Sequence, residues 1–306
     1  MSISNLSLRL YRKTIKRFRS AHAATHWLMT HGAIPILEKS SGFRTMPDDP
    51  FWFRLELLTN RHELETITQL DRLAAPGMTM LDIGAHVGYY SRRYAKKLGK
   101  NGRIFAFEPH PRTFATLQHN VKRTPQVTAV QLALAEKEGT AELHDYLMMS
   151  ASGSLHYDES MVALQKSQTQ QTDIAPRIGQ TFMAQTFTVR TTPIDTFLAQ
   201  QGIEKVDLVK MDIEGAEIGA LRGMQRTIAN SANLVLVMEY NPQALNAFGH
   251  QPIAALDEVQ SFGFTKMEAI EADGRLTDLT HQPEHLQNLT EQLMQNMGVI
   301  NLLLRK

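Results

Sequence analysis

The stretch MTMLDIGAHVGYYSRRYAKKLGKNGRIFAFEP, residues 78–109, decides the fold, because it predicts a strand, a glycine turn, a helix and a second strand. Residues 78–81 form an apolar run that is short enough for a buried strand. Residues 89–98 have helical spacing, with apolar and basic side chains on different faces. Residues 104–107 form the second apolar run. A strand, a helix and a strand in this order predict an α/β domain with a parallel sheet.

Glycines and acids mark the points where these two strands end. Gly84 and Gly88 let the backbone approach a ligand closely, and the following helix presents a positive dipole end to an anionic group. Glu108 ends the second strand, where a carboxylate can accept both hydroxyls of a ribose. The predicted cofactor-binding residues are Asp82, Gly84, Ala85, His86, Gly88 and Glu108.

The glycine spacing favours S-adenosylmethionine over a dinucleotide as the cofactor. Dinucleotide-binding turns have the pattern G-x-G-x-x-G, whereas the pattern here is D-x-G-x-x-x-G. Asp82 can contact the ammonium group of the amino-acid tail, directly or through water, while the helix end contacts its carboxylate. An NAD(P)-dependent oxidoreductase or epimerase is the alternative enzyme, but the chain contains no Tyr-x-x-x-Lys sequence. An ordinary strand–helix–strand unit without a cofactor is the other alternative.

The composition is that of an ordinary globular protein. The 306 residues are enough for one large domain or for one domain with an extension, and 42% of them are hydrophobic. The net charge of +1 gives no general attraction to nucleic acid or membranes. Cysteine is absent, which excludes disulfides and thiolate metal sites. The sequence has no apolar run of membrane-spanning length and no clear signal peptide, so we expect a cytoplasmic protein.

A basic segment precedes the cofactor-binding unit. Residues 1–37 contain no acid, and residues 1–30 combine an apolar helical face with arginines and lysines. Such a helix either makes weak peripheral contact with an anionic membrane or packs on the domain with a solvated basic rim. We assign residues 1–75 to an N-terminal helical extension, which either covers the pocket or only packs on the domain, and residues 76–306 to the cofactor-binding domain.

Two strands predicted further along the chain lead into acidic residues. Residues 206–213 (VDLVKMDI) form a strongly apolar strand before Glu214, and residues 233–238 form another before Glu239 and Asn241. In doubly wound sheets the ligand binds outside the carboxyl ends of the strands. We therefore expect a mostly parallel, doubly wound sheet with helices on both faces and an antiparallel closing strand. The other predicted strands are 127–134, 141–147, 186–191, 264–270 and 299–304.

Two local predictions concern the C-terminal half of the chain. A single helix is predicted over residues 217–228, and another over residues 253–262. His281 and His285 flank Pro283. They are predicted to lie in a loop, because proline interrupts the interior of a helix.

Several of these segments resemble the successive motifs of FkbM-type methyltransferases, which use S-adenosylmethionine. They are LDIGAHVGYYS, FAFEPHP, LVKMDIEGAE and VMEYNP, with SASGSL and VRTTPIDTF as intermediate motifs. The resemblance implies a Rossmann-like methyltransferase fold and, most often, O-methylation of sugars, glycans, lipids or secondary metabolites. The residues that match the family's cofactor positions are Asp82, Gly84, Gly88 and Glu108. His86 stands where members more often carry Asn, but a neutral histidine can still donate a hydrogen bond, so we expect cofactor binding to survive.

Methyl transfer to oxygen needs an acceptor held in line with the cofactor and a group that helps its proton to leave. The candidate catalytic residues are Lys210, Asp212, Glu214 and Glu239. Clustered carboxylates raise one another's pKa, which suits a base, and Lys210 points to the same face as Asp212 if the strand is regular. One alternative is Mg²⁺ held by Asp212, Glu239 and Asn241. Another is a structural role, in which Glu214 caps the following helix.

The acceptor is expected to be a small molecule, a glycan or a lipid. Nucleic acid is not expected, because Asn241-Pro242 is followed by Gln243 and the chain has no Asn-Pro-Pro-Tyr stretch. Residues 157–185 are rich in Gln and Thr with few apolar anchors, and we expect them to leave the domain as a mobile excursion. A non-catalytic protein that binds a membrane surface or a partner is the remaining alternative, against which the intact strand-end carboxylates argue.

Overall fold

The computed structural model describes residues 19–145, 150, 153–156 and 185–306. Most of the basic segment and of the Gln-rich segment, residues 1–18 and 157–184, lies outside the described residues. The chain divides into two compact units, residues 1–62 and 63–306. The first unit contains helices α2 (Arg19–Leu28), η2 (Met29–Ala33), α3 (Ile34–Ser41) and α4 (Phe51–Leu58). Within the described ranges, no helix has the length and apolar character needed to cross a membrane.

Helix α5 (Leu64–Leu73) belongs to the second unit, although the sequence analysis places it in the extension. Its inner face bonds to that unit, since Gln69 Nε2 donates to the Gly274 carbonyl at 2.6 Å. The buried residues of this helix are Thr66, Ile67, Gln69 and Leu70. The second unit therefore begins at Glu63 rather than at residue 76. A covering role for the residues before it stays a prediction.

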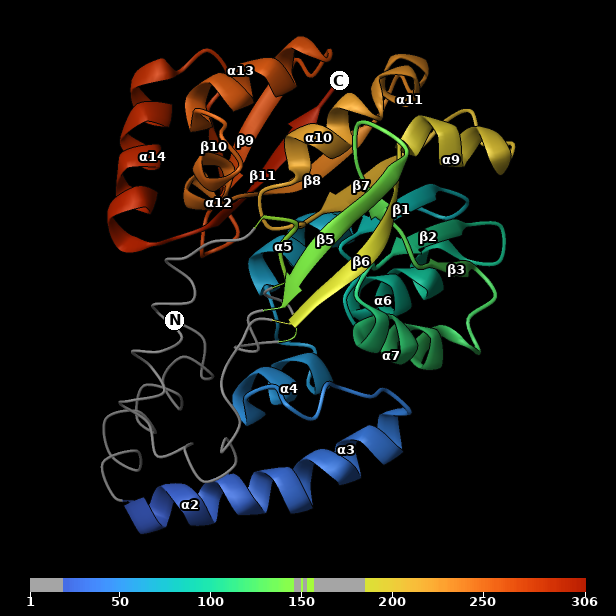
Figure 1. Cartoon of the computed structure of the whole chain (residues 1–306), viewed down its shortest axis with the longest axis vertical. Coiled ribbons are helices and arrows are strands. Elements are labelled where there is room, and N and C mark those ends of the chain that lie inside the picture. Colours follow the sequence, from blue (N-terminus) through green and yellow to red (C-terminus); the bar gives the residue numbers. More distant parts are fainter. Residues whose placement is uncertain (1–18, 146–149, 151–152, 157–184) are drawn as a thin grey trace. The chain divides into compact units, whose positions relative to one another are not determined.

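An eight-stranded sheet forms the centre of the second unit (Figure 1). Its order is β10-β9-β11-β8-β7-β1-β2-β3. β1, β2, β3, β7 and β8 run parallel, and β11 runs antiparallel between β8 and β9. The predicted doubly wound sheet with an antiparallel closing strand is confirmed. The strands are β1 (Thr79–Ile83), β2 (Arg103–Phe107), β3 (Val127–Val130), β7 (Leu208–Met211), β8 (Val235–Tyr240), β9 (Lys266–Ile270), β10 (Leu276–Asp278) and β11 (Ile300–Arg305).

The direction of strand addition reverses beside β1. From β1 the chain runs outward to β2 and β3, and it returns on the other side of β1 as β7 and β8. In doubly wound sheets a ligand crevice lies at this switch point, outside the carboxyl ends of the strands. The acids that follow or end β1, β2, β7 and β8 are therefore brought to one edge of the sheet.

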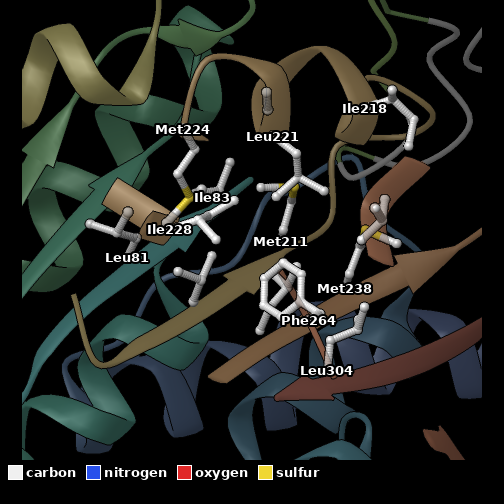
Figure 2. Packing of buried hydrophobic residues seen from close by; sticks show 14 of the residues in the cluster. Leu81, Ile83, Met211, Ile218, Leu221, Met224, Ile228, Met238, Phe264 and Leu304 are labelled. Atoms are coloured by element: carbon white, nitrogen blue, oxygen red, sulfur yellow. The ribbon is translucent and has the colours of Figure 1, made fainter. Parts of the chain in front are cut away.

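The two faces of the central strands differ in character, because successive side chains alternate between them. One face is apolar, and Leu81, Ile83 and Met211 lie on it in the main core (Figure 2). The helices that contribute to this core are α9 (Ile194–Gln200), α10 (Glu217–Arg222), α11 (Gln225–Asn230), α12 (Pro242–Ala247), α13 (Pro252–Ser261) and α14 (Pro283–Asn296). On the other face Asp82 is the register partner of Lys210. The helices α6 (Tyr89–Leu98) and α7 (Pro111–Val121) cover that face.

A separate three-stranded sheet has the order β4-β6-β5. Its strands are β4 (Ala133–Leu134), β5 (Gly139–Asp145) and β6 (Gln185–Thr192). The single strand predicted over residues 127–134 is wrong, because the chain turns after Val130, whose carbonyl accepts the Leu132 N–H at 3.2 Å, and β4 then pairs with β6. The strands predicted over 141–147 and 186–191 form as far as residues 141–145 and 186–191, with 146 and 147 outside the described residues, and they pair with each other in this second sheet. Side-chain alternation within a strand carries no information on which sheet it joins.

Two helix predictions are also corrected. The helix predicted over residues 217–228 is broken into α10 and α11 at Gly223, where a Cβ would lie 2.4 Å from the Ala135 carbonyl oxygen. The loop predicted around Pro283 contains His281, but His285 lies in the first turn of α14. Proline is compatible with the first position of a helix, because the N–H that it lacks has no partner within the helix there.

The turn after β1 gives a test of the fold. Gly84 has a φ of 76°, and a Cβ there would lie 1.9 Å from the Asp212 carbonyl oxygen; Gly77 has a φ of 85° and open space around it. Gly77→Ala should cost about 1–2 kcal/mol, the conformational penalty alone. Gly84→Ala should add about 1–3 kcal/mol of overpacking to the same penalty. Urea unfolding followed by circular dichroism measures both; equal losses would show that β1 and β7 do not approach each other here.

Candidate active site

Four acids lie at the carboxyl ends of four adjacent strands. Asp82 is in β1, Glu108 follows β2, Asp212 follows β7, and Glu239 is in β8. These strands are neighbours in the sheet, in the order β8-β7-β1-β2. The structure therefore brings the cofactor residues and the catalytic residues predicted from the sequence to one edge of the sheet.

The turn from β1 to α6 has a backbone that few residues adopt. Gly84, His86 and Gly88 have φ values of 76°, 51° and 84°. Gly88 precedes the first turn of α6, and no side-chain cap is found at that end of the helix among the described residues. The strained His86 is fixed from two sides: its N–H donates to Glu108 Oε2 at 3.0 Å, and its Nε2 lies 2.5 Å from Ser150 Oγ. The turn and the helix end form a surface of backbone groups suited to an anionic tail.

Glu108 is buried and links the turn to the end of β2. One carboxylate oxygen accepts the His86 N–H and the other accepts the His110 N–H, at 3.0 and 2.8 Å. Burial raises the pKa of Glu108 to about 7, against the lowering effect of these hydrogen bonds. Each carboxylate oxygen has two acceptor positions, so both can still accept a hydroxyl proton. This arrangement fits the two hydroxyls of a ribose.

Asp82 is fully buried and incompletely bonded. Its Oδ2 accepts the Ser91 hydroxyl at 2.5 Å, while Oδ1 has no hydrogen-bond partner among the described residues. Burial raises the pKa of Asp82, and the nearby Lys210 charge opposes this shift. A buried acceptor without a partner is costly unless a ligand supplies a donor. An ammonium group from the cofactor would supply it, so the residues fit S-adenosylmethionine.

Lys210 and Asp212 form an ion pair in which the lysine is buried and the aspartate is partly exposed. Lys210 is 3% exposed, and its Nζ donates to Asp212 Oδ2 at 2.8 Å. The ammonium also lies over the ring of Tyr90, 5.0 Å from the ring centroid. Burial alone would lower the pKa of Lys210, but the carboxylates around it, Asp212 first, hold that pKa above its usual value. The two side chains thus share the face that the strand periodicity predicts.

The carboxylates of Asp212, Glu214 and Glu239 converge, with one oxygen of each lying within 4.8 Å of the others. Burial, followed by the charge of Asp212, raises the pKa of Glu214 to about 8. The same causes raise the pKa of Glu239 well above its usual value, and Glu239 Oε2 is buried without a hydrogen-bond partner in the described part of the chain. A carboxylate whose pKa lies near neutrality suits general base catalysis.

The same geometry is compatible with a divalent cation. Three carboxylate oxygens, from Asp212, Glu214 and Glu239, lie at a spacing that suits Mg²⁺. Asn241, the further predicted ligand, caps α12 (Pro242–Ala247), because its Oδ1 accepts the Ala244 N–H at 3.1 Å, and its side chain also hydrogen-bonds Glu214. Metal binding stays a prediction.

The structural alternative for Glu214 is not what the structure shows. Helix α10 begins after Ala216, and in the described part of the chain no side chain caps it. The carboxylate that bonds the backbone there belongs to Glu217, whose Oε1 accepts the Ile213 N–H at 3.0 Å. Glu214 has a φ of 54°, an uncommon conformation for a residue other than glycine. Its side chain is therefore directed to the cluster by the turn rather than used for capping.

Sequence reasoning missed three groups that contact the predicted site residues. Ser150 contacts His86, and Ser154 Oγ donates to the Glu214 carbonyl at 3.3 Å. Both serines lie in SASGSL, a segment noted for its resemblance but given no role. The contact of Tyr90 with Lys210 was also missed, because the helical spacing of Tyr90 indicates an ordinary core residue.

Residues 82–266 match the methyltransferase FkbM domain. The chain belongs to the FkbM methyltransferase family. It is similar to the 2-O-methyltransferase NoeI of Sinorhizobium fredii, with 27% identity over 62% of this chain and 74% of the relative. It is also similar to the hexuronic acid methyltransferase AglP of Haloferax volcanii, with 26% identity over 67% of this chain and 75% of the relative. The structure of Aeropyrum pernix fibrillarin with natively bound S-adenosyl-L-methionine matches 76% of this chain and 68% of that one, with 9% identity and a TM-score of 0.41.

The FkbM assignment settles the enzyme class and the cofactor. The protein is a methyltransferase, and its cofactor is S-adenosylmethionine, as the spacing of Asp82, Gly84 and Gly88 predicts. The alternatives of a nicotinamide-dependent enzyme and of a non-catalytic binding protein are therefore wrong. The family assignment says nothing about which side chains carry out the transfer.

Glu217 should make the stability of the FkbM protein depend on pH. Burial raises its pKa to about 7 in the folded state, so the folded protein binds this proton more tightly than the unfolded chain does. Stability should therefore fall as the pH rises from about 4.5 to about 7, by about 3 kcal/mol from this residue. Glu217→Gln removes the titration while keeping an acceptor for the Ile213 N–H. Urea unfolding between pH 5 and pH 8 should show a shallower decline for the variant; parallel declines would mean that Glu217 is already ionised at low pH.

Proposed function

We propose that this FkbM protein transfers a methyl group to a hydroxyl of a sugar, a glycan, a lipid or a secondary metabolite, with a sugar hydroxyl favoured. The observation that supports O-methylation is the convergence of Asp212, Glu214 and Glu239 beside the cofactor strands. Such a cluster can take the proton that a hydroxyl acceptor must lose. The names of two relatives, a 2-O-methyltransferase and a hexuronic acid methyltransferase, favour a sugar.

In this proposal the ends of β1 and β2 hold the cofactor. Glu108 would accept the ribose hydroxyls, Asp82 Oδ1 would accept from the ammonium, and the amino end of α6 would hold the carboxylate. The bound cofactor supplies an electrophilic methyl group on a sulfonium. The protein contributes positioning, because an acceptor oxygen held in line reacts far faster than a free one.

The acids at the ends of β7 and β8 handle the acceptor: they orient its hydroxyl and take up the proton that it loses. Glu214, with a pKa of about 8, is the proposed proton acceptor, because it is both basic enough to take a proton and partly ionised near neutral pH. Asp212 is fixed by Lys210 and orients the acceptor hydroxyl. Glu239 lies in the same cluster and hydrogen-bonds a hydroxyl of the acceptor.

The proposal is tested by transfer of labelled methyl from S-adenosylmethionine to a panel of sugars, glycans, lipids and small-molecule alcohols. Label should enter a hydroxyl-bearing acceptor as an ether. Asp212→Asn and Glu214→Gln should lower kcat, by about 10²–10⁴-fold for the residue that acts as the base, and should leave the Kd of S-adenosylhomocysteine unchanged. Glu108→Gln is the matched control, since it should weaken cofactor binding instead.

Three outcomes would contradict the proposal. Label recovered in an amine or in nucleic acid would rule out O-methylation as the main activity. Full turnover by both Asp212→Asn and Glu214→Gln would remove the cluster from the reaction. A loss of folding in both variants, seen by circular dichroism, would mean that the carboxylates serve the structure.

A further inference from the structure

Tyr90 joins parts of the site that lie far apart in the sequence. The Lys210 ammonium lies over its ring, 5.0 Å from the centroid. Its hydroxyl donates to Glu63 Oε2 at 2.5 Å. Tyr90 is the second residue of α6, directly after the glycine turn that ends at Gly88. One side chain therefore links the cofactor turn, the start of α5 and the ion pair at the end of β7.

Lys210 needs more than Asp212 to stay in place. Its ammonium is buried, and removing such a charge from water costs free energy unless opposite charges surround it. Lysine carries this charge on a flexible four-carbon stem, so one contact leaves several positions open to it. The negative face of an aromatic ring attracts a cation directly above it, and this attraction is stronger in a desolvated site. The ring of Tyr90 thus restricts where the Lys210 charge can lie.

Tyr90 can act in this way because it is held itself. It is 6% exposed, and its ring stacks on Tyr94 with a centroid distance of 6.4 Å and an interplanar angle of 8°. Tyr89 meets the same ring edge-on at 5.3 Å. The hydrogen bond to Glu63 fixes the far end of the side chain. These contacts hold the ring of Tyr90 in one orientation.

We propose that Tyr90 is a positioning residue for methyl transfer, which holds Lys210 against Asp212 so that the acidic cluster keeps its reactive arrangement. The inference rests on the proposed role of Asp212 and Glu214 in the reaction. Tyr90 acts through Lys210 and not on the acceptor. Because it follows Gly88 by two residues, the segment that holds the cofactor tail also sets the position of the charge on the acceptor side.

Substitutions that separate the ring from the hydroxyl test this role. Tyr90→Leu removes the ring, and Tyr90→Phe keeps it but loses the bond to Glu63. We expect Tyr90→Leu to lower kcat by about 10- to 100-fold, the size of effect that misplacement of a catalytic group by a small distance produces. The KM for S-adenosylmethionine should stay within about threefold, because the cofactor contacts lie elsewhere. Tyr90→Phe should restore most of the kcat, since phenylalanine also attracts a cation.

Phe197→Leu is the matched control. Phe197 is a buried ring of α9 that packs edge-on against Phe105 and Phe107 in the main core, on the face of the sheet opposite Lys210. Removing it deletes a buried aromatic ring without touching Lys210 or the contacts that hold Tyr90. Its kcat, corrected for the folded fraction from thermal unfolding, should stay near that of the unaltered protein. An equal loss of kcat in Phe197→Leu and Tyr90→Leu would reduce Tyr90 to a packing residue.

A double variant tests whether Tyr90 acts through Lys210. If it does, Tyr90→Leu should cause no further loss of kcat in a Lys210→Met background, because the group that it positions is already gone. The inference would be overturned if the kcat losses of the two single variants multiplied in the double variant. It would also be overturned if Tyr90→Phe were as slow as Tyr90→Leu. Asp212→Asn and Glu214→Gln measured alongside keep the two proposals apart. Full turnover in those two variants would overturn the role of the cluster, whereas reduced turnover with an unaffected Tyr90→Leu would overturn the role of Tyr90 alone.

Discussion

Lys210 Nζ lies 2.8 Å from Asp212 Oδ2, inside a region where carboxylates from several elements meet. Burial would lower the pKa of this lysine, but Asp212, Glu63 and Asp82 together outweigh it, so the ammonium stays charged. The charge of Lys210 in turn opposes the rise that burial causes in the pKa of Glu214. Without that cation, mutual repulsion and desolvation would drive the acids to bind protons or move apart. The geometry of the site therefore depends on where this charge is held.

The fold supplies what the ion pair needs. The reversal of strand order beside β1 places the ends of β1, β2, β7 and β8 next to one another, so acids from distant segments share one edge. Two non-glycine residues there, His86 and Glu214, have left-handed backbone conformations with φ values of 51° and 54°. Such conformations persist where surrounding bonds enforce them. The His86 N–H is bonded to Glu108, and the Glu214 carbonyl accepts the Ser154 hydroxyl.

The sequence predicted the parts of this arrangement that have local signals. The glycine turn, the apolar runs and the acids after them need no knowledge of distant partners, and they gave β1, α6, β2 and the strand-end acids. The split between β3 and β4 depends on the pairing of β4 with β6, and the break between α10 and α11 depends on the Ala135 carbonyl packed against Gly223. The contact of Tyr90 with Lys210 is of the same kind, since it joins a helix and a strand that are far apart in the chain.

A crystal structure with S-adenosylhomocysteine, the demethylated form of the cofactor, tests the central claim most directly. That claim is that the cofactor lies over the ends of β1 and β2 with its sulfur turned toward the acids at the ends of β7 and β8. The account predicts ribose hydroxyls bonded to Glu108, the amino group at Asp82 Oδ1, and the sulfur facing Asp212 and Glu214. A ribose that does not contact Glu108, or a sulfur that faces away from Asp212 and Glu214, would contradict it.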